Sequence, residues 1–132
     1  MSVSLFTYGT LMFAEVWRRI AIGEFRSQPA TLRGFAVYRL RDSVIPGMVY
    51  ADADSLSPGV VYHDIDEETL FELDAYESDL YQRISVRVTT EDGSAVDCQA
   101  YVIPDRSRQA LTDEPWDAAW FEQNELESYL RG

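Results

Sequence analysis

Short apolar stretches of strand length recur along the chain, and turn residues separate most of them. The predicted strands are residues 3–8, 28–41, 44–51, 59–65, 80–90 and 95–103. The last two form a hairpin around Glu91, Asp92 and Gly93. Gly34 marks a bulge or bend in the long second strand. Pro46 confines the third strand to an edge or a loop crossing, because proline cannot donate to a central ladder.

Three further segments carry apolar residues at helical spacing. They are residues 11–22 with Thr10 as N-cap, residues 67–77 with Asp66 as N-cap, and a closing helix at about residues 115–131. The covered stripe of the closing helix is predicted to contain Trp116, Ala119, Trp120, Gln123 and Leu126 or Leu130. Short strands with about three helices predict a single α+β domain over residues 1–132, since no linker is long enough to separate two domains. We expect the sheet to curl into a small barrel, although this pattern alone does not separate a barrel from an open sheet.

The residue inventory excludes several kinds of partner and chemistry. Acidic residues number 23 against 11 basic ones, and the formal charge of −12 disfavours nucleic acid as a partner. All 11 basic residues are arginine, so mechanisms that need a lysine are excluded. The chain has one histidine, His63, and one cysteine, Cys98, which cannot build the usual zinc sites. The acidic segment 51–59 lacks the ligand pattern of a calcium loop. We therefore expect no metal and no cofactor, and chemistry carried by carboxylates, hydroxyls and backbone.

The sequence also carries no signal for a membrane or an oxidising compartment. No apolar stretch approaches the roughly 18 residues that a membrane span requires. The first basic residue is Arg18, so the basic region of a signal peptide is missing. A single cysteine cannot form an internal disulfide, and we expect Cys98 to be packed rather than reactive. We therefore expect a cytoplasmic protein with no membrane partner.

Residues 7–11, TYGTL, form the first candidate for a binding site. Here a predicted strand ends at glycine and a helix follows directly. Such a turn leaves several backbone N–H groups unpaired and pointing the same way, which suits a phosphate or a carboxylate. The alternative is that Gly9 and Thr10 serve only the geometry of the turn.

Residues 73–83, LDAYESDLYQR, form the second candidate. Asp74 and Glu77 lie three residues apart and therefore share one helical face. Glu77 ends the predicted helix, where the helix dipole disfavours a carboxylate. A residue placed against its local preference is an indication of function. The alternative is a solvated acid at a helix end.

Seven motifs follow one another along the chain: YGTL, RGFAVYRL, IPGMV, GVVY, LDAYE, YQRISVRV and QAYVI. Their order resembles the gamma-glutamylcyclotransferase-like family, which includes gamma-glutamylamine cyclotransferases and the plant avirulence-induced proteins. The resemblance runs from about Phe6 to Ile103, and the closing helix from Pro115 lies outside it. Ser78 departs from the pattern, because many members have glycine after the glutamate.

The resemblance implies a small mixed β-barrel with flanking helices, and an enzyme that cyclises a gamma-glutamyl amide or peptide to 5-oxoproline. The implied substrate-binding loop, whose backbone amides hold the α-carboxylate, consists of Tyr8, Gly9, Thr10 and Leu11. Glu77 is the implied general acid/base. Tyr81 and Arg83 match the family's YxR motif, and they either contact the ligand or serve the structure. The implied partner is a small gamma-glutamyl molecule whose identity stays open.

The implied reaction agrees with the residues that are present. Attack by an amine within one molecule needs a held conformation rather than a metal, a lysine or a histidine. One carboxylate can move both protons if burial raises its pKa towards neutrality. Two alternatives stay open: a non-catalytic module that binds a small metabolite on the same fold, and a related enzyme that removes a gamma-glutamyl group in a biosynthetic pathway. The oligomeric state stays open as well.

Overall fold

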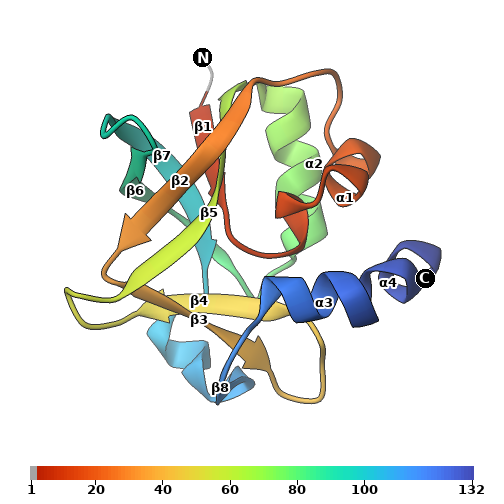
Figure 1. Ribbon diagram of the computed structural model, residues 1–132. Helices are drawn as coiled ribbons and strands as arrows, with labels where there is room; N and C mark the ends of the chain where they lie inside the picture. Colours follow the sequence, from red (N-terminus) through yellow and green to blue (C-terminus); the bar gives the residue numbers. More distant parts are fainter. Residues whose placement is uncertain (1–2) are drawn as a thin grey trace.

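The strands form two sheets in the computed structural model, which describes residues 3–132 (Figure 1). The first sheet is a closed barrel with the strand order β1-β5-β2-β6-β7. These strands are β1 (Val3–Thr7), β2 (Ser27–Arg33), β5 (Leu56–Ile65), β6 (Gln82–Thr90) and β7 (Ala95–Val102). Parallel pairing of β1 with β7 closes the barrel, whereas all other neighbouring strands of the barrel pair antiparallel. The predicted α+β class with a small mixed barrel is confirmed.

The second sheet is antiparallel and lies below the barrel in Figure 1, with the order β4-β3-β8. Its strands are β3 (Phe35–Leu40), β4 (Pro46–Tyr50) and β8 (Leu111–Pro115). β4 lies at the edge of this sheet, the kind of position that a strand containing proline can occupy. The sequence pattern does not predict β8.

The helices flank the two sheets. They are η1, a 3₁₀ turn (Thr10–Met12), α1 (Ala14–Ile20), α2 (Glu67–Glu77), η2, also 3₁₀ (Asp105–Ala110), α3 (Ala118–Asn124) and α4 (Leu126–Arg131). α1 and α2 contact each other beside the barrel, and α3 and α4 follow one another at the C-terminal end (Figure 1). Within residues 3–132, no helix has both the length and the apolar character to cross a membrane.

Two hydrophobic cores lie on the two faces of the barrel wall. Phe6 belongs to a buried cluster with residues from all five barrel strands, and this cluster fills the barrel. The preceding residue, Leu5, belongs to a second cluster with Trp17, Leu73 and Phe121, which come from three different helices. Consecutive side chains of a strand point to opposite faces, so β1 joins the two cores. The loop that follows β1 is therefore fixed by packing on both sides.

The predicted strand 28–41 is interrupted at Gly34. Gly34 has φ +88°, a conformation that favours glycine, and the chain turns there from β2 in the barrel into β3 in the second sheet. The predicted bend is therefore confirmed. The prediction of one continuous strand is wrong, because the two halves pair in different sheets.

The predicted helix 11–22 is also divided. The short turn η1 precedes α1, and the residues before them, Gly9 and Phe13, make no side-chain cap. Thr10 as an N-cap is therefore wrong, and its hydroxyl instead bonds the hydroxyl of Tyr76 at 2.7 Å. The other predicted cap is confirmed, because Asp66 accepts a hydrogen bond from the N–H of Thr69 at 2.8 Å.

The single closing helix from Pro115 is wrong as well. Pro115 ends β8, and a break at Glu125 separates α3 from α4. The predicted stripe fails in α3, where Trp120 is 49% exposed and Phe121 is fully buried. The reason is long-range packing, because Phe121 lies between the rings of Phe13 and Trp116, at centroid distances of 5.7 and 5.5 Å.

Candidate active site

A cavity of about 160 Å³ lies where the loop after β1, the C-terminal end of α2 and the start of β4 meet. Six residues predicted for the site line it together: Tyr8, Gly9, Thr10, Leu11, Glu77 and Tyr81. The other lining residues are Phe6, Thr7, Leu40, Ile45, Pro46, Tyr76, Ser78, Leu80, Tyr101 and Tyr129. Arg83 is outside this lining. The two candidate stretches of the sequence thus meet in one cavity.

The loop after β1 lines the cavity and carries free backbone donors. Its carbonyl groups close the 3₁₀ turn, with Met12 N–H donating to Gly9 O at 3.0 Å and Phe13 N–H to Thr10 O at 3.1 Å. Within residues 3–132, no acceptor takes the N–H groups of Gly9, Thr10 and Leu11. A helix start leaves such donors unpaired. The arrangement can therefore bind a carboxylate.

Packing against Pro46 explains why residue 9 is a glycine. A Cβ atom on Gly9 would lie 2.8 Å from Cγ of Pro46. The loop can approach the start of β4 this closely only without a side chain at residue 9, and this contact joins two walls of the cavity.

Glu77 supplies the acidic group of the cavity and ends α2. Its side chain is half-buried, and burial raises the pKa of Glu77 to about 7, with the negative charge of Asp74 adding to the rise. Its carboxylate makes no hydrogen bond within the part of the chain that the structure describes. A carboxyl with this pKa can both accept and donate a proton near neutral pH.

The helix stops at Glu77 because the backbone reverses at the next residue. Ser78 has φ +68° and ψ −177°, a conformation that is essentially restricted to glycine. This gives a physical reason for the glycine that many family members carry at the position where this chain has Ser78.

Asp74 and Arg83 form a polar group next to the cavity. The guanidinium of Arg83 pairs with both carboxylate oxygens of Asp74, at 3.0 and 3.2 Å, and also donates to Gln99. The hydroxyl of Tyr101 donates to Asp74 at 2.6 Å. In this arrangement Arg83 orients Asp74, the charged neighbour of Glu77, which agrees with the structural alternative for the YxR motif.

Five tyrosines line the cavity. Burial is the main cause that raises the pKa of Tyr8, Tyr76, Tyr81 and Tyr101 well above the ordinary tyrosine value. These hydroxyls are therefore neutral at physiological pH. The hydroxyl of Tyr81 donates to the carbonyl of Pro46 at 2.6 Å, which ties the segment between α2 and β6 to β4.

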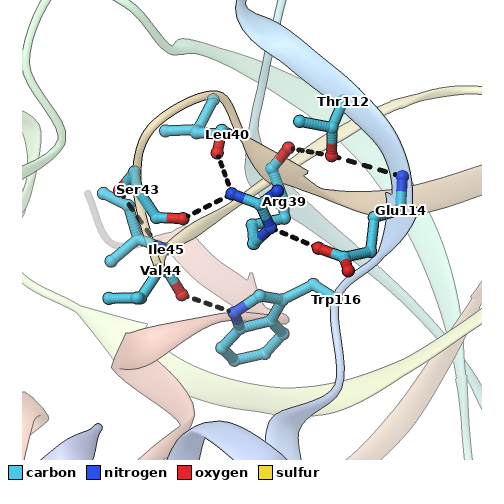
Figure 2. Close-up of polar contacts among 8 residues, drawn as sticks. All are labelled: Arg39, Leu40, Ser43, Val44, Ile45, Thr112, Glu114 and Trp116. Carbon is cyan, nitrogen blue, oxygen red and sulfur yellow. Dashed lines mark hydrogen bonds and ion pairs between the residues drawn. The ribbon is translucent and has the colours of Figure 1, made fainter.

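Polar contacts hold the loop of residues 41–45, called the strapped loop here (Figure 2). Ile45, at the end of this loop, lines the cavity. Arg39 donates to the carbonyls of Leu40 and Ser43 at 3.1 and 2.9 Å and pairs with Glu114 of β8. The indole N–H of Trp116 donates to the carbonyl of Val44 at 2.9 Å. The segment after β8 therefore holds one wall of the site.

Sequence reasoning missed several of these residues. Tyr76 lies in the predicted helix of residues 67–77, but no signal placed it at a site. Pro46 and Ile45 belong to a motif of the family pattern that was interpreted only as a strand. Tyr129 carries no sequence signal at all, because its place in the cavity depends on how α4 folds back.

The single histidine and the single cysteine lie outside the cavity. His63 lies outside the cavity and is within hydrogen-bond distance of Ser4 and Gln28, at 3.4 and 3.0 Å. Cys98 is buried, as predicted, and burial raises the pKa of its thiol to about 12. Across residues 3–132, no group of three or more His, Cys, Asp or Glu side chains is placed to hold a metal ion.

The barrel and its cavity define a small α+β protein with one site where a backbone loop and a carboxyl group meet. The family model "Gamma-glutamyl cyclotransferase, AIG2-like" matches residues 5–118. The chain therefore belongs to the gamma-glutamyl cyclotransferase, AIG2-like family. A comparison with curated proteins finds no match.

Solved structures agree with this fold. A protein from Arabidopsis thaliana is 23% identical with a TM-score of 0.77, and the match covers 99% of this chain and 79% of the other. An AIG2-like protein from Mus musculus is 23% identical with a TM-score of 0.69, over 88% of each chain. A gamma-glutamyl cyclotransferase specific to glutathione, from yeast, is 14% identical with a TM-score of 0.62, over 99% of this chain and 88% of the other. At these identities the likeness is one of fold.

Proposed function

We propose that this protein is a gamma-glutamylcyclotransferase that converts a small gamma-glutamyl amide or peptide into 5-oxoproline and a free amine or amino acid. In this proposal Glu77 is the general acid/base. The backbone N–H groups of residues 8–11 hold the α-carboxylate of the substrate, and Tyr81 lines the space around it. No cofactor is required.

One observation carries the proposal: the unpaired N–H groups of Gly9, Thr10 and Leu11 and the half-buried carboxyl of Glu77 line the same cavity. A gamma-glutamyl group carries an α-carboxylate and an α-amine on one carbon atom. A site that binds the first places the second beside it, within reach of a proton acceptor. Membership of the family supports the same reaction.

The reaction balances without any other reactant. The substrate's α-amine, once deprotonated, attacks the γ-carbonyl carbon, and a new C–N bond closes the five-membered ring. Ionised Glu77 accepts the proton that the attacking nitrogen loses. The same carboxyl then donates this proton to the leaving nitrogen as the original amide C–N bond breaks. Because the attack is intramolecular, holding the substrate in a folded conformation lowers the barrier further.

The test is a turnover assay on a panel of gamma-glutamyl amines, gamma-glutamyl amino acids and glutathione, with 5-oxoproline as the product measured. We expect turnover of at least one compound by the wild type. Glu77→Gln should lower kcat by roughly 100-fold or more, because the amide keeps the size of the side chain but cannot accept the proton. Binding of the substrate should persist, since the loop binds through its backbone.

Asp74→Asn is the comparison variant, because it leaves Glu77 in place and should lower kcat far less than Glu77→Gln does. Equal activity of Glu77→Gln and wild type would remove Glu77 from its role. Binding without turnover of any compound would favour the metabolite-binding module. Activity confined to a larger biosynthetic gamma-glutamyl compound would favour the enzyme that removes a gamma-glutamyl group from such a compound.

A further inference from the structure

The cavity receives one side chain from the end of the chain. Tyr129 lies in α4, beyond residue 118, where the match to the family model ends. It lines the cavity together with the loop after β1 and Glu77. The family pattern therefore does not account for this part of the wall.

Tyr129 is joined to the substrate-binding loop by a chain of hydroxyl groups. Its hydroxyl bonds that of Tyr76, and Tyr76 bonds the hydroxyl of Thr10 at 2.7 Å. This places Tyr129 at the end of the cavity where the free N–H groups of the loop lie.

The position of Tyr129 is supported from behind. Its ring packs edge-to-face on Phe121, with centroids 5.7 Å apart, and Phe121 is fully buried. Arg19 of α1 also donates a hydrogen bond to the carbonyl of Leu130, the residue after Tyr129. α4 is thus tied to the core and to α1.

A second hollow borders the same two tyrosines. Tyr76 and Tyr129 line this hollow as well, together with Val16, Arg19, Ile20 and Leu130 among others. Its volume is about 520 Å³, compared with about 160 Å³ for the cavity. The Tyr76–Tyr129 pair therefore borders both spaces and forms a partition between them.

We infer that Tyr129 is a specificity-determining residue, which closes the cavity at the loop end and limits substrates to gamma-glutamyl groups that carry nothing beyond their α-carboxylate. This inference rests on the proposed function, because it uses the loop as the site of the α-carboxylate. A substrate extended at that carboxyl, as in a peptide bond to a further residue, would meet the partition.

The experiment compares two substrates that differ only at the α-carboxyl. One is gamma-glutamylmethylamide. The other is the same compound with its α-carboxyl joined to glycine. Both release methylamine on cyclisation, so one assay gives kcat/KM for each. Wild type should prefer the unextended compound, and Tyr129→Ala should reduce this preference by roughly 10-fold or more, the size of effect that one group in a pocket can produce.

Three variants distinguish a role of Tyr129 as a wall of the cavity from a general disturbance of helix α4. Leu130→Ala is the matched control, because Leu130 lines the outer hollow and not the cavity, and the wild-type preference should persist. Tyr129→Phe keeps the ring, so the preference should persist while loss of the hydroxyl raises KM. If Tyr129→Ala does not fold, Tyr129→Leu keeps apolar packing on Phe121 and still shortens the wall. An unchanged preference in the folded variant of Tyr129 overturns the inference.

The inference and the proposed function can fail separately. If wild type releases no methylamine, the proposed function fails, and the partition is then tested by calorimetric binding of 5-oxoproline against 5-oxoprolylglycine. A preference for the smaller compound that Tyr129→Ala reduces supports the partition without turnover. Binding of neither compound, or an equal preference in both proteins, overturns it.

Discussion

Two effects raise the pKa of Glu77, and each can be changed without the other. Burial is the larger cause, and the charge of Asp74 is the second. Asp74 is itself held by Arg83 and Tyr101, whose donors keep its carboxylate in one orientation. Asp74 therefore influences the acidity of Glu77 without lining the cavity.

Replacement of Asp74 by asparagine should shift the pH profile of activity. A general base works in its ionised form, so kcat/KM should rise with pH through the pKa of Glu77, about 7 in the wild type. Asp74→Asn removes a negative charge that raises this pKa, so the rise should occur at lower pH. The measurement is amine release between about pH 5 and pH 9.

The control for this shift is Glu72→Gln, an exposed change on the same helix, α2. Its profile should coincide with that of the wild type. A profile of Asp74→Asn that is unchanged or moved to higher pH would contradict the electrostatic account.

At the residue scale, the sequence pattern located the two ends of the site because each is a short contiguous motif. Gly9 and Thr10 interrupt a strand, and Glu77 opposes a helix dipole, so both break a local rule that can be recognised. Tyr129 and Ile45 break no such rule. Their place in the cavity depends on pairing and packing between distant segments, which the pattern does not encode locally. The chemical roles of Glu77, residues 8–11, Tyr81 and Arg83 stay predictions.

Among the elements, the short strand β8 and the segment after it hold one wall of the cavity in place. They hold the strapped loop, residues 41–45, through Glu114 and Trp116 (Figure 2). This loop carries Ile45 and leads into Pro46, and both line the cavity. A change in the strap should therefore act on substrate binding as well as on stability.

Trp116→Phe tests this strap by removing the indole N–H and keeping an aromatic ring. We expect the free energy of unfolding to fall by about 1 kcal/mol, because the carbonyl of Val44 loses its partner. KM should rise with kcat nearly unchanged, because the wall is less well fixed while Glu77 is untouched. Urea denaturation and steady-state kinetics measure the two effects.

Trp120→Phe is the matched control, because Trp120 is 49% exposed and follows in the next helix. It should change neither quantity appreciably. If both tryptophan variants behave alike, the hydrogen bond to Val44 does not hold the wall.

The elements that sequence patterns missed share a physical cause. β8 has only one buried residue, Leu111, so it shows no alternation, and it exists because β3 offers it a partner. The break between α3 and α4 lies at Glu125, directly after Asn124, where no glycine or proline marks it. The hairpin of β6 and β7 and helix α2 were predicted well, because their turn and cap are local.

For the whole molecule, the formal charge of −12 creates a field that acts on charged substrates. At neutral pH gamma-glutamylglycine carries one net negative charge, whereas gamma-glutamylmethylamide is net neutral. Raising NaCl from about 10 to about 150 mM screens the field over distances beyond about 8 Å. We expect kcat/KM for gamma-glutamylglycine to rise by roughly two-fold over this range.

The neutral methylamide serves as the reference in this titration, and its kcat/KM should stay nearly constant. An equal salt response for both substrates would show that the overall charge does not influence binding. The comparison needs no variant, since the two substrates share the gamma-glutamyl group and differ in the charge of the part that leaves.

The closure of the barrel by β1 and β7 has a consequence for the order of folding. Leu5 in the first strand pairs with Gln99 in the last strand of the barrel, so this contact joins two segments that are far apart in the chain. Closing such a long loop is entropically costly, and contacts of this kind slow folding. During synthesis from the N-terminus, β1 leaves the ribosome long before its parallel partner does. The loop of residues 8–11, which directly follows β1, is therefore expected to reach its final geometry only when the barrel closes, so the site matures at the end of folding.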